Sequence, residues 1–426
     1  MKLADLTTIP LPTDRGLTET VYIRPGARHD VHTLAAPYLG ETPLVVADPE
    51  TWAAVSPLPE AVAQWPRLVL PTHPHADDET VEQVRARMES EGATGALAIG
   101  AGTINDLCKR ACHLLEKPYV VLGTAASMNG YASGIAAIMS AGLKTTVPAT
   151  PPRSIILDTE ILSQAPMTLT HAGLGDLISK PVSDTCWWLA DQLDGVGYST
   201  TPGKIVEAAV AGAAAAAGQL PEPEAVGALG KALVLSGVSM VVAGSSSPAS
   251  GGEHLLSHLW DMEAVQAGEE TRLHGTQVGV TTCITAALYQ RLLKVTEPDF
   301  PPVPSWADEE ARLKAAHGEL APIVLEPSKG KHGTAERRVA IMRARWSEML
   351  ADLKARTLPT PAEVRAILDA AGAPSTLEAI NEDRANAARV LRLARDIRNR
   401  ITVLDVAYDL GVLPDAAEAV LDEAGV

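Results

Sequence analysis

Three histidines and one aspartate in the second half of the chain have the types and spacing of a metal site. His254 and His258 lie four residues apart in SGGEHLLSH, so a helix would place both imidazoles on one face. His274 begins a later helix-like run, and Asp176 lies in the segment AGLGDLISK. One carboxylate with two or three imidazoles can bind a divalent metal and leave a position open for substrate. A histidine pair at this spacing is more often structural, so both interpretations stay open at this point.

The other histidines and the cysteines form weaker patterns. His73 and His75 form an H-x-H pair among prolines, where a turn before a helix is the simpler interpretation. Cys108 and Cys112 lie four residues apart on an expected helix, as two small core residues would. The four cysteines of the chain include no CxxC pair. The sequence therefore predicts no disulfide framework and fits a reducing cytoplasm.

Two segments of small and polar residues in the first half could bind the phosphates and ribose of a dinucleotide. GAGTIND, at 100–106, joins an apolar run to a helix-like segment. Glycines at such a turn let backbone N–H groups approach a phosphate, whose charge the helix N-terminus favours. GTAASMNGYAS, at 123–133, follows the next apolar run. Neither segment is a complete G-x-G-x-x-G or P-loop motif, so ordinary turns with helix caps remain the alternative.

Asp48 ends another apolar run and could accept hydrogen bonds from ribose hydroxyls. An aspartate at this kind of position also serves as a helix N-cap. The residue type alone favours the N-cap.

The elements that must position these segments are predicted by the apolar pattern of the first 160 residues. The runs are rich in valine, isoleucine and leucine without strict alternation, as in buried parallel strands. DDETVEQVRARMESE, at 77–91, predicts a helix whose two leading aspartates suit its N-terminus. Alternating strands and helices predict an open α/β sheet. The expected strands cover 43–47, 67–70, 95–99, 119–122 and 153–157.

Beyond residue 160 the chain becomes rich in alanine and leucine and predicts a mostly helical region. We place the boundary near 159–166, which gives an α/β domain at 1–162 and a helical domain at 163–426. A proline-rich stretch at 297–306 predicts a surface excursion. The expected helices include 204–217, 255–265, 278–293, 335–355 and 380–403.

Composition excludes several classes of protein. The 426 residues predict two or three domains, and 46% hydrophobic with 20% charged residues exclude a disordered chain. Lysine and arginine total 35 against 52 aspartates and glutamates, with a net charge of -17 and no basic run, which argues against nucleic acid as a partner. The first residues contain Asp5 and two prolines where a signal peptide needs an apolar run. The uncharged stretch at 118–143 contains polar residues and glycines and does not predict a membrane helix.

Taken in order, these segments resemble the sn-glycerol-1-phosphate dehydrogenase branch of the iron-containing (group III) alcohol dehydrogenase superfamily, which also includes glycerol dehydrogenase and dehydroquinate synthase. The resemblance implies a dehydroquinate synthase-like fold. In that fold an α/β dinucleotide-binding domain precedes an all-α domain, and the active site lies in the cleft between them. The matching segments are GAGTIND, GTAASMNGYAS, AGLGDLISK, SGGEHLLSHLWDM (250–262), HGTQVG (274–279) and ARDIRNRITVLDVAYDLG (394–411).

The resemblance also implies roles for individual residues. Asp176, His254 and His274 match the metal ligands, with zinc the usual metal of the branch, and His258 joins them as a catalytic residue. Asn129, Asp176 and His258 match substrate-contacting positions, and Asp48 matches the acidic residue near the adenosine ribose. The matching cofactor-binding positions are Gly100, Gly102, Thr103, Ile104, Asn105, Asp106, Thr124, Ala125, Ala126, Ser127 and Ser133.

The implied reaction interconverts a small polyol phosphate and its ketone with NAD or NADP, as in glycerol 1-phosphate and dihydroxyacetone phosphate. A divalent metal would polarise the substrate oxygen, and His258 could relay a proton or hold a hydroxyl group. Zinc, iron, nickel and manganese all suit these ligand types. We expect a cytoplasmic homo-oligomer that acts on a small molecule and has neither nucleic acid nor membrane as a partner.

Two departures from the family pattern keep other substrates open. Asn129 stands where the family often has aspartate, and Ser247 stands before Pro248 where an arginine is expected. Losing that cation leaves room for an unphosphorylated polyol, a cyclitol or another phosphate ester. A dehydroquinate synthase-like cyclase is a further alternative, although those relatives usually have glutamate where this chain has Asp176. The chain is also long for the branch, with the extra length expected within 297–338.

Overall fold

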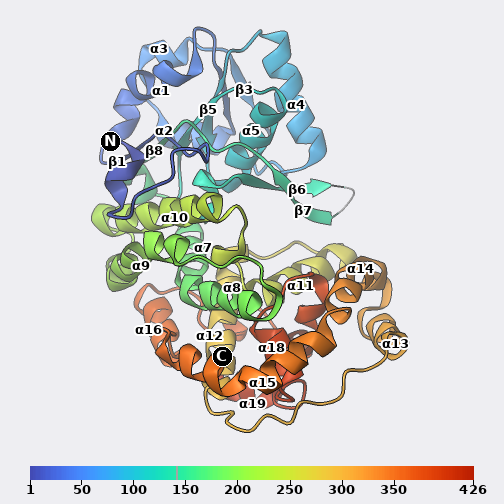
Figure 1. Cartoon of the computed structure of the whole chain (residues 1–426). Helices are drawn as coiled ribbons and strands as arrows, with labels where there is room; N and C mark the ends of the chain where they lie inside the picture. Colours follow the sequence, from blue (N-terminus) through green and yellow to red (C-terminus); the bar gives the residue numbers. More distant parts are fainter. Residues whose placement is uncertain (141–142) are drawn as a thin grey trace. The chain divides into compact units, whose positions relative to one another are not determined.

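The computed structural model describes residues 1–140 and 143–426, which form two compact units (Figure 1). Unit 1 consists of residues 1–177 and 201–245, and unit 2 of residues 178–200 and 246–426. An α/β unit and a helical unit are as expected. The division differs from the expected boundary between 162 and 163 because α10 (Pro223–Ala243) packs on α6 (Thr159–Leu162) and on the sheet strand β1. Part of the helical half therefore completes unit 1.

Unit 1 is built on a parallel sheet with the strand order β1-β8-β5-β4-β2-β3. The five expected strands are confirmed, and each end is shifted by no more than one residue. Their apolar residues were a reliable signal because these side chains are buried or lie against the helices of the unit. The edge strand β1 was not expected. The strands are β1 (Thr20–Arg24), β2 (Leu44–Ala47), β3 (Arg67–Val69), β4 (Ala96–Gly100), β5 (Tyr119–Gly123) and β8 (Ser154–Asp158).

Helices connect and cover these strands. The expected helix at 77–91 is α4 (Asp78–Ser90), and the Asp77 carboxylate caps it by accepting the Thr80 N–H at 2.7 Å. A second, antiparallel sheet of β6 (Ile135–Ser140) and β7 (Leu143–Pro148) was not expected. The remaining helices of the unit are α1 (Val31–Leu39), α2 (Pro49–Val55), α3 (Glu60–Ala63), α5 (Gly102–Leu114), α7 (Met167–Ile178) and α9 (Thr200–Ala215).

Helix α10 is long and apolar enough to cross a membrane by length and composition alone. However, 72% of its most apolar 18-residue window is buried inside the structure. A core helix of a folded domain has the same properties, and α10 contacts η3 (Asn129–Ala132) as well as α6 and β1. We therefore describe α10 as a core helix of unit 1.

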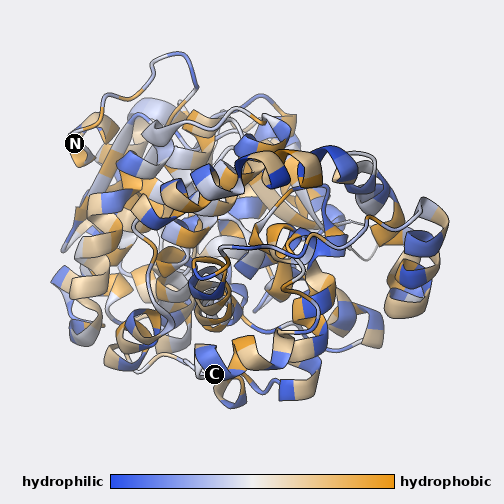
Figure 2. Cartoon of the chain, turned by 60° about the horizontal axis from the view of Figure 1, so that its bottom comes forward, coloured by the Kyte–Doolittle hydropathy of each residue, from blue (hydrophilic) through white to orange (hydrophobic). Residues whose placement is uncertain are grey.

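Unit 2 consists of helices, with no strand in its described residues 178–200 and 246–426. α12 (His274–Leu292) is almost entirely buried, and α8, α11, α16, α18 and α19 all pack against it. Figure 2 shows hydrophobic and hydrophilic residues on the same helices, as expected for helices that bury one face. The other helices are α8 (Lys180–Asp194), α11 (Gly252–Ala267), α13 (Trp306–His317), α14 (Ala321–His332), α15 (Ala335–Ala355), α16 (Pro361–Ala370), α17 (Arg384–Leu393), α18 (Val403–Asp409) and α19 (Ala417–Ala424).

The expected helix at 380–403 is wrong in its extent. α17 and the short helix η8 (Ala394–Ile397) occupy its middle, and the chain is then irregular up to α18. The break follows from a capping box, in which the Thr402 side chain accepts the Leu404 N–H and Asp405 accepts the Thr402 N–H at 2.9 Å. The proline-rich residues 297–305 form neither a helix nor a strand and are partly exposed, as expected of a surface excursion.

Candidate active site

The three histidines come together within unit 2. His254 and His258 lie on α11, and His274 is the first residue of α12, which packs against α11. The ring centroid of His274 lies 5.2 Å from that of His254 and 5.0 Å from that of His258, and the His258 and His274 rings are stacked within 7° of parallel. The shared helical face predicted from the spacing of His254 and His258 is confirmed by a centroid distance of 6.1 Å.

Two glycines allow α11 to begin close to its neighbours. A Cβ atom on Gly251 would lie 2.8 Å from the Cys186 Sγ of α8, and one on Gly252 would lie 3.0 Å from a Val403 side-chain carbon of α18. These contacts fix where the first turn of α11 lies, and with it His254.

A buried carboxylate orients His254. Nδ1 of His254 lies 2.8 Å from Oε1 of Glu253, which also accepts hydrogen bonds from the Ser183 hydroxyl at 2.5 Å and the Gly251 N–H at 2.7 Å. Burial opposes ionisation of Glu253, but these hydrogen bonds outweigh it, with His254 the largest contributor, and hold the pKa of Glu253 below its ordinary value. An ionised Glu253 accepts the Nδ1 proton, so Nε2 of His254 keeps its lone pair.

A hydroxyl group orients His274 in the same way. Oγ of Ser257 lies 2.9 Å from Nδ1 of His274 and 2.5 Å from Oε1 of Gln277. The Ser257 hydroxyl donates its one proton to Gln277, so Nδ1 of His274 carries the proton that it donates to Ser257. The lone pair of the His274 ring then lies on Nε2. Metal-binding histidines are held in this manner, with one ring nitrogen bonded to protein oxygen and the other left for the metal.

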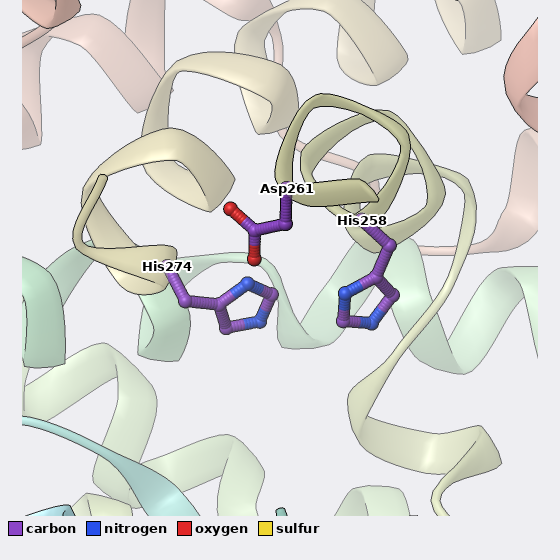
Figure 3. Close-up of side chains that lie close together, drawn as sticks. All are labelled: His258, Asp261 and His274. Atoms are coloured by element: carbon purple, nitrogen blue, oxygen red, sulfur yellow. The ribbon is translucent and has the colours of Figure 1, made fainter. Parts of the chain in front are cut away.

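Asp261 completes a cluster that the sequence reasoning missed. The ligand atoms of His258, Asp261 and His274 all lie within 4.8 Å of one another, and Figure 3 shows the Asp261 carboxylate next to the His274 ring, with the His258 ring to one side. Asp261 is 4% exposed. It follows His258 by three residues on α11, and this spacing was the signal that could have found it.

Asp176 lies on α7, in unit 1. It is 4% exposed, and its Oδ2 accepts the Asn129 N–H at 3.3 Å. Nδ2 of Asn129 donates to Oγ of Ser236 on α10 at 3.4 Å. The structure therefore brings two of the substrate-contacting positions of the family pattern together, and the role of Asp176 as a metal ligand stays a prediction.

Close helix packing shapes the polar segment at 123–133. A Cβ atom on Gly173 of α7 would lie 1.9 Å from the carbonyl oxygen of Ala126, and one on Gly237 of α10 would lie 2.5 Å from that of Asn129. Only glycine lets both helix backbones approach the segment this closely. The positions of Ala126 and Asn129 therefore depend on α7 and α10.

The predicted dinucleotide positions follow the carboxyl ends of adjacent parallel strands. Asp48 follows β2 and Gly102 begins α5 after β4, and β2 and β4 are parallel neighbours from which the chain continues to opposite sides of the sheet. Such a switch point is where open α/β sheets bind nucleotides. Gly100 is opposite Gly123 in the register of β4 and β5, so both polar segments begin at this end of the strands. Gly102 and Thr103 are partly exposed at the N-terminus of α5.

Asp48 has the N-cap role that its residue type favours. Its Oδ1 accepts the Thr51 N–H at 2.8 Å at the start of α2. The contact with an adenosine ribose stays a prediction.

Three predicted cofactor-binding side chains form hydrogen bonds inside unit 1. Asn105 accepts from the Tyr119 hydroxyl and donates to Asp106, whose other oxygen accepts the Ala137 N–H at 3.0 Å. Ser133 lies 3.1 Å from Nζ of the buried Lys109. Their cofactor contacts stay a prediction. Of the other positions, Ile104, Thr124, Ala125 and Ala126 are buried, and Ser127 is partly exposed.

Comparisons with known proteins agree with this architecture. Residues 22–166 match the model of the iron-containing alcohol dehydrogenase family. The glycerol-1-phosphate dehydrogenase [NAD(P)+] of Halalkalibacterium halodurans is 29% identical over 315 residues, which cover 72% of this chain and 69% of that protein. The Pyrococcus horikoshii enzyme of the same name is 36% identical over 211 residues, 49% of this chain and 60% of that protein. The crystal structure of glycerol dehydrogenase from Schizosaccharomyces pombe has a TM-score of 0.60 at 14% identity, with 98% of this chain and 94% of that chain covered.

The resemblance to the iron-containing alcohol dehydrogenase superfamily found in the sequence is confirmed by the family model over residues 22–166 and by the curated relatives. The curated relatives are glycerol-1-phosphate dehydrogenases, which supports the resemblance to that branch of the superfamily.

Proposed function

We propose that the chain is a metal-dependent, NAD(P)-linked dehydrogenase that interconverts glycerol 1-phosphate and dihydroxyacetone phosphate. The observation that carries the proposal is the pair His254 and His274, whose Nδ1 atoms both bond to a protein oxygen, so that the lone pair of each ring lies on Nε2, in a cluster with His258. The ligand types favour zinc as the metal. The glycine turn at the switch point of the sheet and the names of the curated relatives support NAD or NADP as the cofactor.

Each part of the site has a role in this reaction. When bound, a divalent metal supplies a Lewis acid that polarises the oxygen of the substrate. Glu253 and Ser257 hold the two imidazoles in the orientation that such an ion needs. His258 is partly exposed and stacked on His274, where it can hold a substrate hydroxyl or pass a proton. The N-terminus of α5 supplies backbone N–H groups for the pyrophosphate of the dinucleotide.

Two arginines favour a phosphorylated substrate over the unphosphorylated alternatives. Nη1 of Arg400 donates to the carbonyl oxygen of Ser250 at 2.7 Å, two residues before α11, and Arg398 donates to the Ile397 carbonyl at 3.3 Å. Burial lowers the pKa of both guanidinium groups. The ion pairs of the described residues include neither of them. Two partly buried cations without a bonded carboxylate favour an anionic ligand near Ser250. They can supply the charge that Ser247 lacks.

The test is an absorbance assay with dihydroxyacetone phosphate and NADH or NADPH, with and without a chelator. We expect oxidation of the reduced cofactor that the chelator abolishes. If protein that holds metal and cofactor oxidises neither, the substrate assignment fails and a panel of polyols, cyclitols and other phosphate esters follows. A dehydroquinate synthase-like cyclase would consume no net reduced cofactor, because it uses NAD only transiently.

Replacing His254 tests the metal site directly. We expect His254→Ala to lose metal binding and activity while its far-ultraviolet circular dichroism stays that of the wild type, because the imidazole is a ligand and not a large core residue. His73→Ala is the matched control, since the His73 side chain is 83% exposed. A His254→Ala protein that is active without metal would disprove the assignment.

We also propose a cytoplasmic homo-oligomer. All four cysteines are free and buried, which supports a reducing compartment. Sedimentation of the purified protein measures the oligomeric state, and a monomer at micromolar concentration would contradict the oligomer.

A further inference from the structure

We propose that a cavity within unit 2 binds a small apolar α-amino acid in its zwitterionic form. The cavity has a volume of about 160 Å³ and is lined by residues of the proline-rich stretch, α13, α14, α15, η8 and α18. Among the described residues, its lining includes none of the histidines of α11 and α12. Most of the lining belongs to residues 297–338, the range expected to hold the extra length of this chain. The site is therefore distinct from the histidine cluster and from the dinucleotide positions of unit 1.

The size and one wall of the cavity fit a small apolar side chain. A cavity of about 150 Å³ can hold a molecule the size of benzene, so this one has room for a valine or a leucine. His332 fixes the proline-rich stretch beside α14, because its Nε2 donates to the Pro304 carbonyl oxygen at 2.8 Å. The apolar part of the lining consists of Pro301, Pro302, Val303, Val339, Leu413 and Pro414.

Two buried guanidinium groups with unused N–H groups line the polar side of the cavity. Arg338 donates from Nε to Oδ2 of Asp409 at 3.2 Å and from Nη1 to the Lys331 carbonyl oxygen, but its Nη2 forms no hydrogen bond to the described residues. Arg395 lies over the Tyr408 ring, with Cζ 3.6 Å from the ring centroid. Nε and Nη1 of Arg395 lie 3.6 and 3.9 Å from carboxylate oxygens, too far for a hydrogen bond. Because guanidinium N–H groups bind carboxylates strongly, the two arginines favour a ligand with a carboxylate.

One carboxylate beside these arginines has an oxygen that is not used. Oδ2 of Asp409 accepts the Arg338 Nε–H, whereas Oδ1 accepts no hydrogen bond from the described residues. Burial raises the pKa of Asp409 above its ordinary value, although Arg338 opposes this. A cationic group next to Oδ1 offsets the cost of that burial. Because Asp409 and Arg338 are bonded to each other, Oδ1 and Nη2 are close enough to bind the ammonium and the carboxylate of one α-carbon.

The charges of the lining favour a ligand with both charges over a simple anion. Two arginines and one lysine balance three carboxylates, which are Glu309, Asp396 and Asp409. Arg312 donates to Glu309 and Asp396, so Asp409 is the carboxylate left for a ligand. A ligand without net charge keeps this balance, since an excess charge in a buried site costs free energy. The zwitterion of an apolar amino acid has the carboxylate, the ammonium group and the side chain that fit the three parts of the cavity.

Calorimetry on the full chain tests the site with L-valine, L-leucine, L-isoleucine and L-proline. A chelator is present throughout, because free amino acids also bind metal ions. We expect at least one of the four to bind at one site per chain. The corresponding acid and amine each lack one charged group and should bind at least about tenfold more weakly, because each loses a charge-assisted hydrogen bond. The proposal is overturned if none of the four amino acids binds, or if the acid binds as tightly as the amino acid.

Two substitutions show whether the amino acid binds in the cavity. Ala335 is buried in the lining, so Ala335→Leu fills the space without removing a charge, and we expect it to abolish binding. Ala340→Leu is the matched control, because Ala340 is exposed on the same helix. Asp409→Asn removes the partner of the ammonium group, and we expect the preference for the amino acid over the acid to disappear. Circular dichroism checks the fold of each variant. Wild-type affinity in Ala335→Leu, or a preference that persists in Asp409→Asn, would overturn the proposal.

Discussion

Glu253 decides which nitrogen of His254 is available for a metal. Its buried carboxylate accepts the Nδ1 proton and is itself held by Ser183 and Gly251. Glu253→Gln removes the charge while it keeps the shape, so we expect metal affinity to fall about tenfold to a hundredfold. Competition with a chromophoric chelator measures the affinity. Equal affinities for Glu253→Gln and wild type would show that the carboxylate only fills space.

Single residues also show where prediction from the sequence ends. The spacing of His254 and His258 predicted a shared face, because both lie on one helix. Asp261 was missed although it lies on that same helix, because its significance depends on His274 of another helix. The buried Lys109 gave no sequence signal, yet it contacts Ser133 and pairs with Asp106 at 3.5 Å. The spacing of residues within one helix predicts which of them share a face, but it does not predict which residues of another helix they contact.

At the scale of elements, the fit of α7 against the polar segment at 123–133 is testable. A Cβ atom at Gly173 would lie 1.9 Å from the backbone carbonyl oxygen of Ala126, which cannot move without the segment. We expect Gly173→Ala to lower the free energy of unfolding by about 1 to 3 kcal/mol and to weaken NADH binding. Urea denaturation and NADH fluorescence measure the two effects.

Gly212→Ala on α9 is the matched control for this substitution. A Cβ atom at Gly212 would meet no other atom within 4 Å. Alanine in place of glycine within a helix should then raise the stability by up to about 1 kcal/mol. If Gly173→Ala behaved like Gly212→Ala, the close approach of α7 would not limit the position of the segment.

The short helix η8 contacts α13 through the Asp396 side chain, and α14 through the Asp396 carbonyl oxygen, which accepts the Ser328 hydroxyl at 2.9 Å. The Asp396 carboxylate lies 2.9 Å from both His317 and Arg312. Burial opposes ionisation of Asp396, but His317, Arg395 and Arg312 outweigh it and lower the pKa from 3.8 to about 2. Because the pKa is lower in the folded protein, the stabilisation is present above pH 4 and disappears as the pH falls through 2. We expect Asp396→Asn to lose at least about 2 kcal/mol at pH 7 and progressively less below pH 4, measured by urea denaturation. A difference from wild type that does not change with pH would contradict this.

The pattern of the elements explains which of them could be predicted. Strands β2, β4, β5 and β8 are buried along their length. Their runs of valine, isoleucine and leucine predict buried strands, so these four could be found from the sequence. β1 is a short edge strand whose residues are mostly only partly buried, so its sequence, TVYIR, gave too little signal. The break within 380–403 depends on Thr402 and Asp405, a capping box inside an otherwise helical composition.

At the scale of the whole molecule, composition could separate a sheet-rich part from a helical part but could not assign the helices. α7, α9 and α10 have the same alanine- and leucine-rich character as the helices of unit 2. Their residues lie mostly in unit 1, where α10 packs on α6, η3 and β1. An apolar helix face in the sequence predicts that the helix is buried, but it does not predict which unit the helix packs against.

The division into units predicts that metal and cofactor protect different helices from hydrogen exchange. The three histidines lie on α11 and α12 of unit 2, whereas Asp48 and Gly102 begin α2 and α5 of unit 1. A ligand at a hundred times its Kd stabilises the state that binds it by about 2.7 kcal/mol, and slows exchange through local opening by about a hundredfold. We expect zinc to slow exchange in α11 and α12 and NAD+ to slow it in α5, as measured by mass spectrometry. Equal protection of α5 and α11 by zinc alone would mean that the two units open together, and would contradict the separate assignment of the two ligands.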